Sequence, residues 1–395
     1  MSISDRVQKS MEQGAWVRKM WEEGAALKQQ YGDENVFDLS LGNPITEPPV
    51  EFHQELRRIA ETPLPGMHRY MENAGYSETR AAVAGQLSLE TGMNFTQDDI
   101  IMTCGAAGAL NVVLKTILNP EDEVILFAPY FQEYINYIDT HGGTARVLPT
   151  DEQFIPRLDT LETAISAKTR AVLINFPNNP SGAVYSESFL HQLGELLNNK
   201  GNNYGRQIFL ISDEAYRKIV YDGRECPQVW PHYQQSIIAN SYSKDLALPG
   251  ERIGYIAVHP NINQRKELVD GLAHCNRILG YVNAPALMQR VVRHLLTVTV
   301  SVTEYQKKRD LLYDHLTDMG YSIVKPQGTF YIFPKSPLED DETFVRKLQQ
   351  WRVVTTPGRA FGSPGYFRIS YCTDDRTLKG SLTGFQKAAL EFNLR

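Results

Sequence analysis

Residues 237–258 read IIANSYSKDLALPGERIGYIAV, two apolar runs separated by a polar segment that contains one lysine. Ile237–Ser241 and Ile253–Val258 are short and rich in β-branched residues, as expected of buried strands. Lys244 follows the end of the first run. Ligands of parallel α/β sheets bind at the carboxyl ends of the strands. The segment therefore predicts two strands, with a lysine at the ligand-binding edge.

The same pattern extends outwards from this segment. Between Asp99 and about Val258, short apolar runs alternate with longer segments of helical period, which is typical of a mostly parallel sheet covered by helices. Expected helices include Gly108–Leu118 and Glu187–Asn198. The predicted fold class is α/β, with a mostly parallel seven-stranded sheet. Its other strands are expected at Ile100–Thr103, Glu123–Phe127, Ala145–Leu148, Ala171–Asn175 and Ile208–Ser212.

The two ends of the chain have a different pattern. After about Leu287 come a helical region and then short strand-like pieces, and a comparable helix and strand open the chain. This grouping predicts a smaller α+β domain built from residues 1–45 and 288–395, beside a large domain at residues 46–287. The expected elements are a helix to about Gln30, strands at Val36–Leu41, Tyr321–Val324, Thr329–Phe333 and Tyr366–Tyr371, and helices at Ser301–Met319 and from Arg376.

Composition narrows the classes of function. The chain has 395 residues and a formal charge of -6, which gives no electrostatic reason to expect nucleic acid or an anionic membrane as partner. Its 4 cysteines are far apart and form no C-x-x-C pair, so no metal site is predicted. No apolar stretch approaches the roughly 18 residues of a membrane span, and Met1–Lys9 lacks the apolar core of a signal peptide. We expect a cytoplasmic protein that acts on small metabolites.

Two side chains at strand ends have reactive chemistry. A lysine is usually a solvated surface charge, but a desolvated Lys244 would lose its proton more easily and trap a carbonyl compound. Asp213 ends the apolar run Ile208–Ser212. It could cap a helix, or it could face the pyridine nitrogen of a cofactor and keep that ring able to accept electrons. Tyr216 would then reach the ring hydroxyl.

Small residues join a strand to a helix at Thr103–Ala109. Exposed backbone N–H groups at such a helix start suit a phosphate, although small residues also allow close helix–sheet packing. The spacing is not the G-x-G-x-x-G of a dinucleotide-binding site. Arg252, eight residues beyond Lys244, could bind the same phosphate or form a surface salt bridge.

Two further segments could contact a ligand. Asn175–Gly182 forms a rigid turn after a strand, where an asparagine amide could donate to a ring hydroxyl, although turn chemistry alone explains most of it. Arg368 lies inside an apolar strand, where a charge must be paired. A carboxylate of the protein or of a substrate would satisfy it.

Together and in this order, these segments resemble the class I and II aminotransferases of fold type I, the family that includes aspartate aminotransferase. The resemblance extends over nearly the whole chain. Its most specific parts are Asn178-Asn179-Pro180-Ser181-Gly182, Asp213-Glu214-Ala215-Tyr216, Ser241-Tyr242-Ser243-Lys244 and Gly250-Glu251-Arg252-Ile253-Gly254.

The resemblance implies pyridoxal 5′-phosphate as cofactor. Lys244 looks like the Schiff-base lysine, Asp213 the partner of the ring nitrogen, and Tyr216 with Asn179 the partners of the ring hydroxyl. Lys244, Asp213 and Tyr216 are the expected catalytic residues. The implied phosphate ligands are the backbone of Ala106 and Ala107, with Ser241 and Arg252, and Gly105 and Ser243 are expected to contribute to cofactor binding.

Other matches concern the ring, the substrate and a second subunit. Phe131 matches the aromatic residue that lies flat against the cofactor, and would be equally ordinary in a core. Arg368 matches the arginine that holds the substrate α-carboxylate, with Asn179 and the backbone of Gly42 beside it. Tyr70 resembles the tyrosine that reaches the phosphate of the neighbouring subunit, which implies a homodimer with shared sites.

Two segments depart from the family pattern. Ala107 and Gly108 occupy places where many relatives have Ser, Thr or another polar residue. The segment 276–285 differs from the usual Ser-Asn-Pro stretch. Arg277 within it could pair a dicarboxylate side chain or have a structural role. The sequence therefore does not identify the amino donor.

The implied reaction is a ping-pong transfer of an amino group from an L-amino acid to a 2-oxo acid, 2-oxoglutarate being the expected acceptor. The amine of Lys244 would move a proton from the substrate α-carbon. A carbon–sulfur β-lyase or an aminocyclopropane-carboxylate synthase would use the same cofactor residues. A DNA-binding regulator would need a basic helix-turn-helix domain, which the stretch before Leu39 is too short to supply. A dehydrogenase would need the missing glycine fingerprint.

Overall fold

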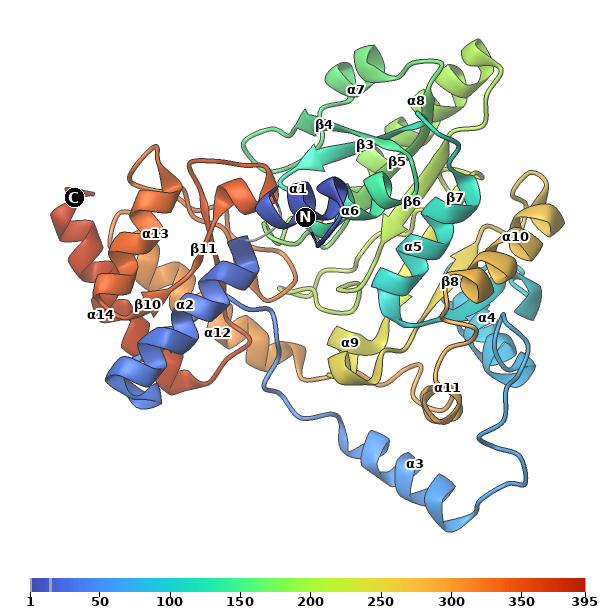
Figure 1. Cartoon of the computed structure of the whole chain (residues 1–395), viewed down its shortest axis with the longest axis horizontal. Helices are drawn as coiled ribbons and strands as arrows, with labels where there is room; N and C mark the ends of the chain where they lie inside the picture. Colours follow the sequence, from blue (N-terminus) through green and yellow to red (C-terminus); the bar gives the residue numbers. More distant parts are fainter. Residues whose placement is uncertain (1, 14–15, 395) are drawn as a thin grey trace.

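The computed structural model describes residues 2–13 and 16–394, and a seven-stranded sheet lies at its centre (Figure 1). The order of the strands is β2-β8-β7-β6-β5-β3-β4. All of the predicted strands of this sheet are confirmed, with ends close to the expected ones. They are β2 (Ile100–Thr103), β3 (Glu123–Ala128), β4 (Thr144–Pro149), β5 (Thr169–Asn175), β6 (Phe209–Asp213), β7 (Ser236–Ser241) and β8 (Gly254–Val258).

One strand of the sheet is antiparallel. β8 runs opposite to both of its neighbours, β2 and β7, while the other pairs are parallel. The chain leaves β7 at Ser241 and returns into β8 at Gly254, its partner in register. The short helix α9 (Tyr242–Asp245), which carries Lys244, lies in this return. The carboxyl ends of β5, β6 and β7 therefore meet at the edge where Lys244 stands.

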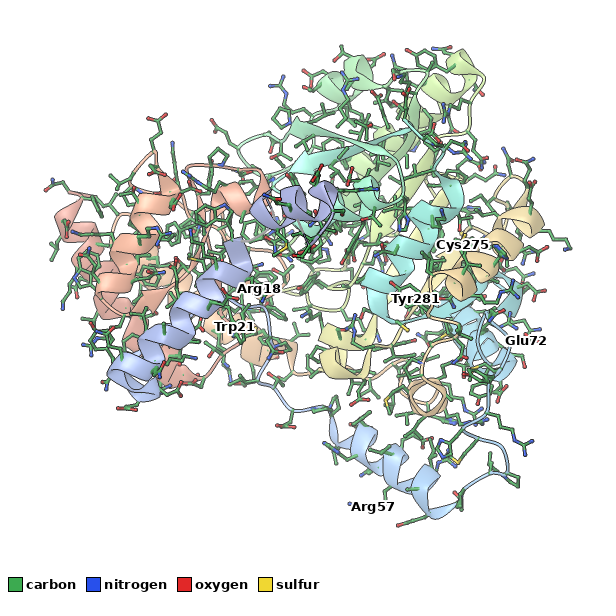
Figure 2. All side chains as sticks on the ribbon, viewed as in Figure 1. Arg18, Trp21, Arg57, Glu72, Cys275 and Tyr281 are labelled. Atoms are coloured by element: carbon green, nitrogen blue, oxygen red, sulfur yellow. The ribbon has the colours of Figure 1, made fainter. Side chains whose placement is uncertain are left out.

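Helices cover both faces of the sheet (Figure 1). One face packs against α5 (Gly105–Ile117), α6 (Glu133–Thr140) and α10 (Arg265–Ile278), and Cys275 lies on the side of α10 that faces α5 (Figure 2). The other face packs against α4 (Ser77–Thr91), α7 (Leu158–Ala164) and α8 (Glu187–Tyr204).

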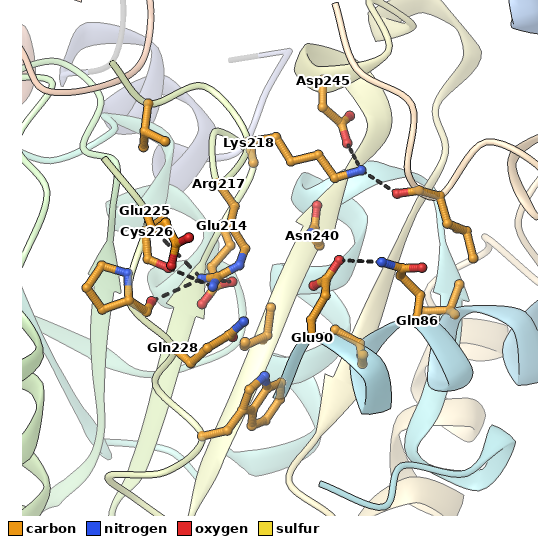
Figure 3. A pocket seen from close by; sticks show the side chains of 18 of the residues that line it. Gln86, Glu90, Glu214, Arg217, Lys218, Glu225, Cys226, Gln228, Asn240 and Asp245 are labelled. Carbon is orange, nitrogen blue, oxygen red and sulfur yellow. Dashed lines mark hydrogen bonds and ion pairs between the residues drawn. The ribbon is translucent and has the colours of Figure 1, made fainter. Parts of the chain in front are cut away.

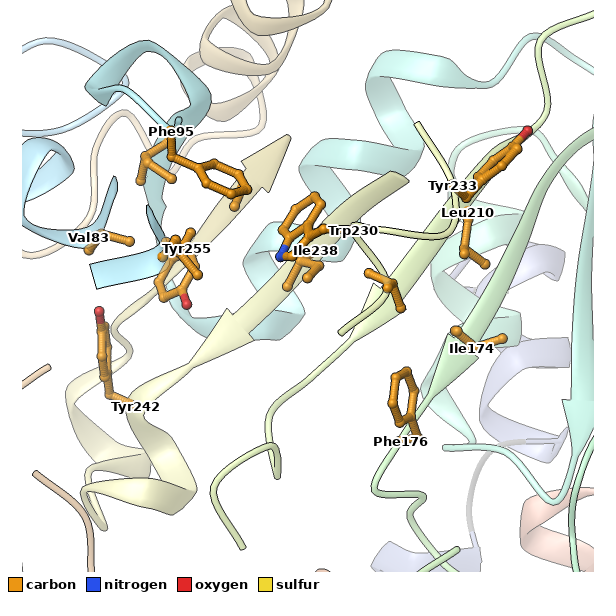
Figure 4. Packing of buried hydrophobic residues seen from close by; sticks show 14 of the residues in the cluster. Val83, Phe95, Ile174, Phe176, Leu210, Trp230, Tyr233, Ile238, Tyr242 and Tyr255 are labelled. Carbon is orange, nitrogen blue, oxygen red and sulfur yellow. The ribbon is translucent and has the colours of Figure 1, made fainter. Parts of the chain in front are cut away.

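Successive residues of the central strands belong to opposite faces, because side chains alternate along a strand. Ile211 and Ile237 pack in the first cluster, with α5, and Leu210 and Ile238 pack in the second, with α8. Figure 4 shows Ile238 beside Trp230, and the rings of Trp230 and Phe95 meet edge to face with centroids 5.1 Å apart. Burial on both faces explains why these strands read as continuous apolar runs.

The two ends of the chain pack together beside the sheet. β1 (Phe37–Asp38) pairs in parallel with β10 (Val353–Val354), and Met20, Val36 and Leu39 share a core with the C-terminal part. The other elements here are α2 (Trp16–Tyr31), α12 (Val302–Asp318), β9 (Tyr331–Ile332), α13 (Asp341–Gln350), β11 (Thr356–Pro357), β12 (Phe367–Ser370) and α14 (Asp375–Glu391). Helix α1 (Asp5–Gln13) instead contacts α6, through Arg6 with Asp139 and Ser10 with Asn136.

The division at residues 46–287 stays a prediction. Helix α11 (Ala286–Val292) places Met288, Val291 and Val292 in the core beside the sheet, where α11 contacts α3 (Val50–Glu61) and α4. Within residues 2–13 and 16–394, no helix is both long and apolar enough to cross a bilayer.

Some predicted elements differ. Tyr321–Val324 is not a strand, because Tyr321 is buried by its ring contacts and donates its hydroxyl hydrogen to Phe385 O at 3.0 Å, without strand pairing. The strands predicted at Val36–Leu41 and Thr329–Phe333 are two residues long. The N-terminal helix is two helices, α1 and α2, and residues 14–15 between them lie outside the described residues.

Candidate active site

A cavity of about 270 Å³ lies at the carboxyl ends of the central strands. The structure brings most of the predicted site residues to it, from the sheet, from the N-terminal segment and from β12. Gly105 and Tyr70 are not among the lining residues. The predicted residues that line it are Gly42, Ala106, Ala107, Phe131, Asn179, Asp213, Tyr216, Ser241, Ser243, Lys244, Arg252 and Arg368.

Lys244 projects its amine into this cavity. Its Nζ donates a hydrogen bond to Gly42 O at 2.8 Å and lies 5.3 Å from the ring centre of Phe330. Burial lowers the pKa of Lys244 to about 8, and the positive charges of Arg368 and Arg252 act in the same direction. A substantial fraction of the amine is therefore neutral near physiological pH, as a nucleophile requires.

Asp213 enters the cavity from the end of β6. Its Oδ2 accepts a hydrogen bond from the Tyr134 hydroxyl at 2.6 Å, and its Oδ1 accepts one from Ala215 N at 3.3 Å. Burial raises the pKa of Asp213, while these two bonds lower it by stabilising the charged form. No helix begins after Asp213, so the alternative role as a helix cap is not supported.

A line of hydrogen bonds joins Asp213 to the opposite wall. Asn175 Nδ2 donates to Asp213 O at 2.9 Å, and Asn175 Oδ1 accepts from Asn179 N at 2.8 Å. Asn179 Oδ1 in turn accepts from Arg368 Nη1 at 3.1 Å. The turn after β5 is thus fixed relative to both the carboxylate and the guanidinium.

Arg368 is a buried cation without an acidic partner among the described residues. It is 3% exposed, donates to Ser40 O at 2.7 Å, and its Nε has no hydrogen-bond partner. Its guanidinium lies 4.4 Å from the ring centre of Tyr331 and 4.6 Å from that of Phe361. A buried cation is tolerated when a carboxylate can pair with it, so this site suits a carboxylate from outside the protein.

Tyr216 and Tyr331 form the floor beneath Lys244. Their hydroxyl oxygens lie 3.0 Å apart, and burial raises the pKa of Tyr216 well above its usual value. Gly42 is needed here because a Cβ at that position would collide with the Tyr331 hydroxyl.

The remaining predicted residues gather at the start of α5. Gly105 has a φ of +72°, and a Cβ there would lie 3.0 Å from Arg252 Nη2. Arg252 is held by a bond to Pro249 O at 2.8 Å, and Ser241 Oγ donates to Ser243 Oγ at 2.7 Å. Backbone N–H groups at a helix start, hydroxyls and a guanidinium together suit a phosphate.

Phe131 and Tyr70 differ in their positions. Phe131 is partly buried, lines the cavity and meets the Tyr134 ring edge to face at 5.5 Å. Tyr70 is 86% exposed, away from the cavity of its own chain.

Sequence reasoning missed Tyr134, Tyr331 and Phe361, which also line the cavity. Tyr134 follows Phe131 by three residues, about one helical turn, and lies in the first turn of α6, so this spacing was the available signal. Tyr331 and Phe361 read only as apolar core residues. Sequence alone did not connect them with Arg368.

The sequence model of the family described as aminotransferase class I and II matches residues 34–382. The chain belongs to this family. The probable aspartate aminotransferase of Methanocaldococcus jannaschii is 30% identical over 355 residues, which are 87% of this chain and 91% of that protein. The aspartate/prephenate aminotransferase of Thermus thermophilus is 30% identical over 374 residues, 92% of this chain and 93% of that protein.

Solved structures of aminotransferases have the same fold. An amino transferase from Eubacterium rectale, 38% identical, superposes over 100% of both chains with a TM-score of 0.96. The aspartate aminotransferase from Thermotoga maritima, 28% identical, covers 98% of this chain and 99% of its own with a TM-score of 0.87.

These findings make the chain a transaminase of the fold type I group. Class I and II aminotransferases use pyridoxal phosphate, act on amino and 2-oxo acids, and generally form homodimers. The relatives named above are all aminotransferases, so the comparisons do not favour the carbon–sulfur β-lyase or the aminocyclopropane-carboxylate synthase alternative.

Proposed function

We propose that this aminotransferase holds pyridoxal 5′-phosphate in the cavity at Lys244 and transfers amino groups from an L-amino acid to 2-oxoglutarate by a ping-pong mechanism. The observation that carries the proposal is Arg368, a buried guanidinium with an unpartnered Nε in the same cavity as the Lys244 amine and the Asp213 carboxylate. The amine and the carboxylate suit the aldehyde and the ring nitrogen of this cofactor, and the guanidinium suits the carboxylate of an amino acid.

The residues that line the cavity suit both the phosphate and the ring of the cofactor. The start of α5, Ser241, Ser243 and Arg252 would hold the phosphate. Tyr216 and Asn179 would contact the ring hydroxyl, Phe131 the ring face, and Lys244 would hold the aldehyde carbon through its amine. When bound, the cofactor supplies an electron-accepting ring that stabilises negative charge at the substrate α-carbon.

Lys244 and Asp213 carry the proton chemistry. Once its amine is free, Lys244 Nζ takes the proton from the substrate α-carbon and later returns one, which suits a base with a pKa of about 8. Asp213, by remaining ionised, would keep the ring nitrogen of the bound cofactor protonated. The hydroxyl of Tyr134 and the N–H of Ala215 stabilise that ionised form against its burial.

Arg368 positions the substrate. Its two Nη groups are held by Asn179 Oδ1 and Ser40 O, and its guanidinium lies against Tyr331 and Phe361. This fixes the guanidinium where it can bind a carboxylate and keeps water away from it, which strengthens the ion pair.

For the substrates, we propose aspartate and 2-oxoglutarate as the first pair. Relatives from Methanocaldococcus jannaschii and Thermotoga maritima are named as aspartate aminotransferases, which supports this choice. Arg277, the alternative contact for a second carboxylate, is exposed at the end of α10 and does not line the cavity of its own chain.

Steady-state kinetics of Arg368→Gln test the proposal. Loss of a buried charge pair should raise KM for both the amino acid and the 2-oxo acid and lower kcat/KM about 100-fold or more. Arg376→Gln, a change at an exposed arginine of α14, should leave both constants unchanged. Normal KM values for both substrates in Arg368→Gln would contradict the proposed role. A screen of acidic, aromatic and small aliphatic amino acids identifies the donor.

The proposal includes a homodimer in which Tyr70 reaches the partner's phosphate site, and a cytoplasmic location. The exposure of Tyr70 supports the first part, because a tyrosine that serves the neighbouring site must be free of its own. Fractionation of cells that produce the protein tests the second.

A further inference from the structure

A second cavity lies on the opposite face of the sheet from Lys244. It has a volume of about 630 Å³ and lies between α4, the ends of β6 to β8 and the segment 214–232 (Figure 3). The two cavities are back to back, because neighbouring residues near the strand ends face opposite sides. Glu214, Asn240 and Asp245 line the second cavity, and their neighbours Asp213, Ser241 and Lys244 line the first.

Three buried polar groups in the wall of this cavity have no hydrogen-bond partner among the described residues. They are Trp230 Nε1, Tyr242 Oη and Asp245 Oδ1, in residues that are 1%, 3% and 6% exposed. A buried polar atom without a partner costs about 1–3 kcal/mol. A polar ligand bound in this cavity would supply partners of this kind.

Of the three Arg and Lys side chains in the wall, two are paired within the protein and the third, Arg224, is exposed. Arg217 pairs with Glu214 at 3.2 Å and donates to Cys226 O at 2.8 Å. Lys218 Nζ donates to Leu296 O at 2.5 Å and lies 3.5 Å from Asp245 Oδ2.

The carboxylates of the wall outnumber its Arg and Lys side chains. Glu90 enters the cavity from α4 and accepts a hydrogen bond from Gln86 at 2.8 Å, with no cation paired to it in the described part of the chain (Figure 3). Asp245 contributes its unpartnered Oδ1. An anionic ligand would meet these carboxylates, and the exposed Arg224 is the one Arg or Lys of the described lining without an ion pair.

We propose that this cavity binds a small organic ammonium ion. Its volume is in the range of small-molecule sites, and aromatic rings together with carboxylates form the usual surroundings of a bound ammonium group. Trp230 and Tyr242 supply the rings, and Glu90 and Asp245 supply the negative charge. An N–H of the ligand would satisfy Asp245 Oδ1 or Tyr242 Oη.

Calorimetric titration of the holoenzyme with trimethylammonium chloride tests the proposal. This tertiary amine cannot condense with an aldehyde, so it does not report on the cofactor. We expect saturable one-site binding at millimolar concentration, and no saturable binding of sodium acetate. Absence of saturable binding by trimethylammonium, or tighter binding of acetate, would overturn the proposal.

Two variants locate the site. Glu90→Gln removes one charge, yet its amide oxygen can still accept the bond from Gln86, and Tyr242→Phe removes only the hydroxyl. Each should weaken binding about tenfold. Glu267→Gln, at an exposed position of α10 on the other face, should not change it. Equal weakening by Glu267→Gln would mean general charge attraction and would overturn the proposal. Glu90→Gln should keep wild-type transaminase activity, which separates the loss of binding from the active site.

Discussion

The amine of Lys244 is held by one hydrogen bond to Gly42 O, in surroundings that disfavour its charge. Because burial lowers its pKa to about 8, the neutral fraction that can attack an aldehyde rises with pH around that value. We predict that the rate at which the apoenzyme binds pyridoxal phosphate increases with pH along a titration curve whose midpoint is near 8. Stopped-flow absorbance measures this rate. A midpoint near 10.5, the ordinary value for lysine, would contradict the description of this site.

The hydroxyl of Tyr134 stabilises the ionised form of Asp213 through a bond of 2.6 Å. Tyr134→Phe should therefore raise the pKa of Asp213 further, so that the carboxylate would draw the proton away from the ring nitrogen of a bound cofactor and the ring would accept electrons less well. A hydrogen bond to a charged group contributes about 1.5–3 kcal/mol, so we expect kcat to fall about tenfold to a hundredfold while substrate KM changes little. The pH dependence of kcat should shift at the same time.

Tyr137→Phe is the matched control, because Tyr137 lies on the same helix, half buried, and is not a lining residue of the cavity. Its kcat and pH profile should match the wild type. If Tyr134→Phe and Tyr137→Phe reduced kcat equally, packing of α6 and not the bond to Asp213 would be responsible.

For single residues, the sequence predicts which side chains stand at strand ends. It does not predict which distant side chains form hydrogen bonds or ion pairs with them. Asp213 and Lys244 could be located because each directly follows an apolar run. Tyr134 could not be paired with Asp213, because the two are 79 positions apart and meet only when α6 covers β6. The sequence also could not show whether a carboxylate of the protein pairs with Arg368, because that depends on tertiary contacts.

At the scale of elements, the start of α5 depends on one backbone conformation. Gly105 has a φ of +72°, and a side chain there would also approach Arg252. We predict that Gly105→Ala destabilises the apoenzyme by about 1–2 kcal/mol, because the left-handed conformation disfavours a Cβ. It should also weaken binding of pyridoxal phosphate. Urea unfolding and a cofactor titration measure the two effects.

Gly85→Ala is the control for this change. Gly85 lies on the exposed side of α4, and a Cβ there would meet nothing within 4 Å. Alanine in a helix interior is more favourable than glycine by about 0.5–1 kcal/mol, so this variant should be slightly more stable. If Gly105→Ala behaved like Gly85→Ala in both measurements, the start of α5 would not depend on its glycine.

The helices and strands that could be predicted are those with a clear hydrophobic pattern in the sequence. The strands of the large sheet, apart from the largely exposed edge strand β4, are buried on both faces and read as apolar runs, which is why they could be located. Tyr321–Val324 has the composition of a strand, but its apolar side chains pack without pairing. β1 and β9 are two residues long, and their limits depend on partner strands that are distant in sequence.

At the scale of the whole molecule, the central proposal about assembly is a site shared between two subunits. Mixing Lys244→Ala and Tyr70→Ala subunits tests it. A hybrid dimer would contain one site with an intact lysine from one chain and an intact tyrosine from the other. We predict that mixing restores cofactor affinity and activity above those of either variant alone.

If the activity of the mixture did not exceed the summed activities of the two variants measured separately, the shared site would be contradicted. Size-exclusion chromatography with light scattering provides the control, because both variants must form dimers that exchange subunits before the activities are compared.

The central claim is that the ε-amine of Lys244 holds the cofactor. Reduction of the holoenzyme with borohydride, followed by peptide mass spectrometry, tests it most directly. We predict that the reduced cofactor is found on the peptide that contains Lys244, and that Lys244→Ala carries none. Attachment to another lysine, such as Lys218 in the second cavity, or no attachment at all, would contradict the account.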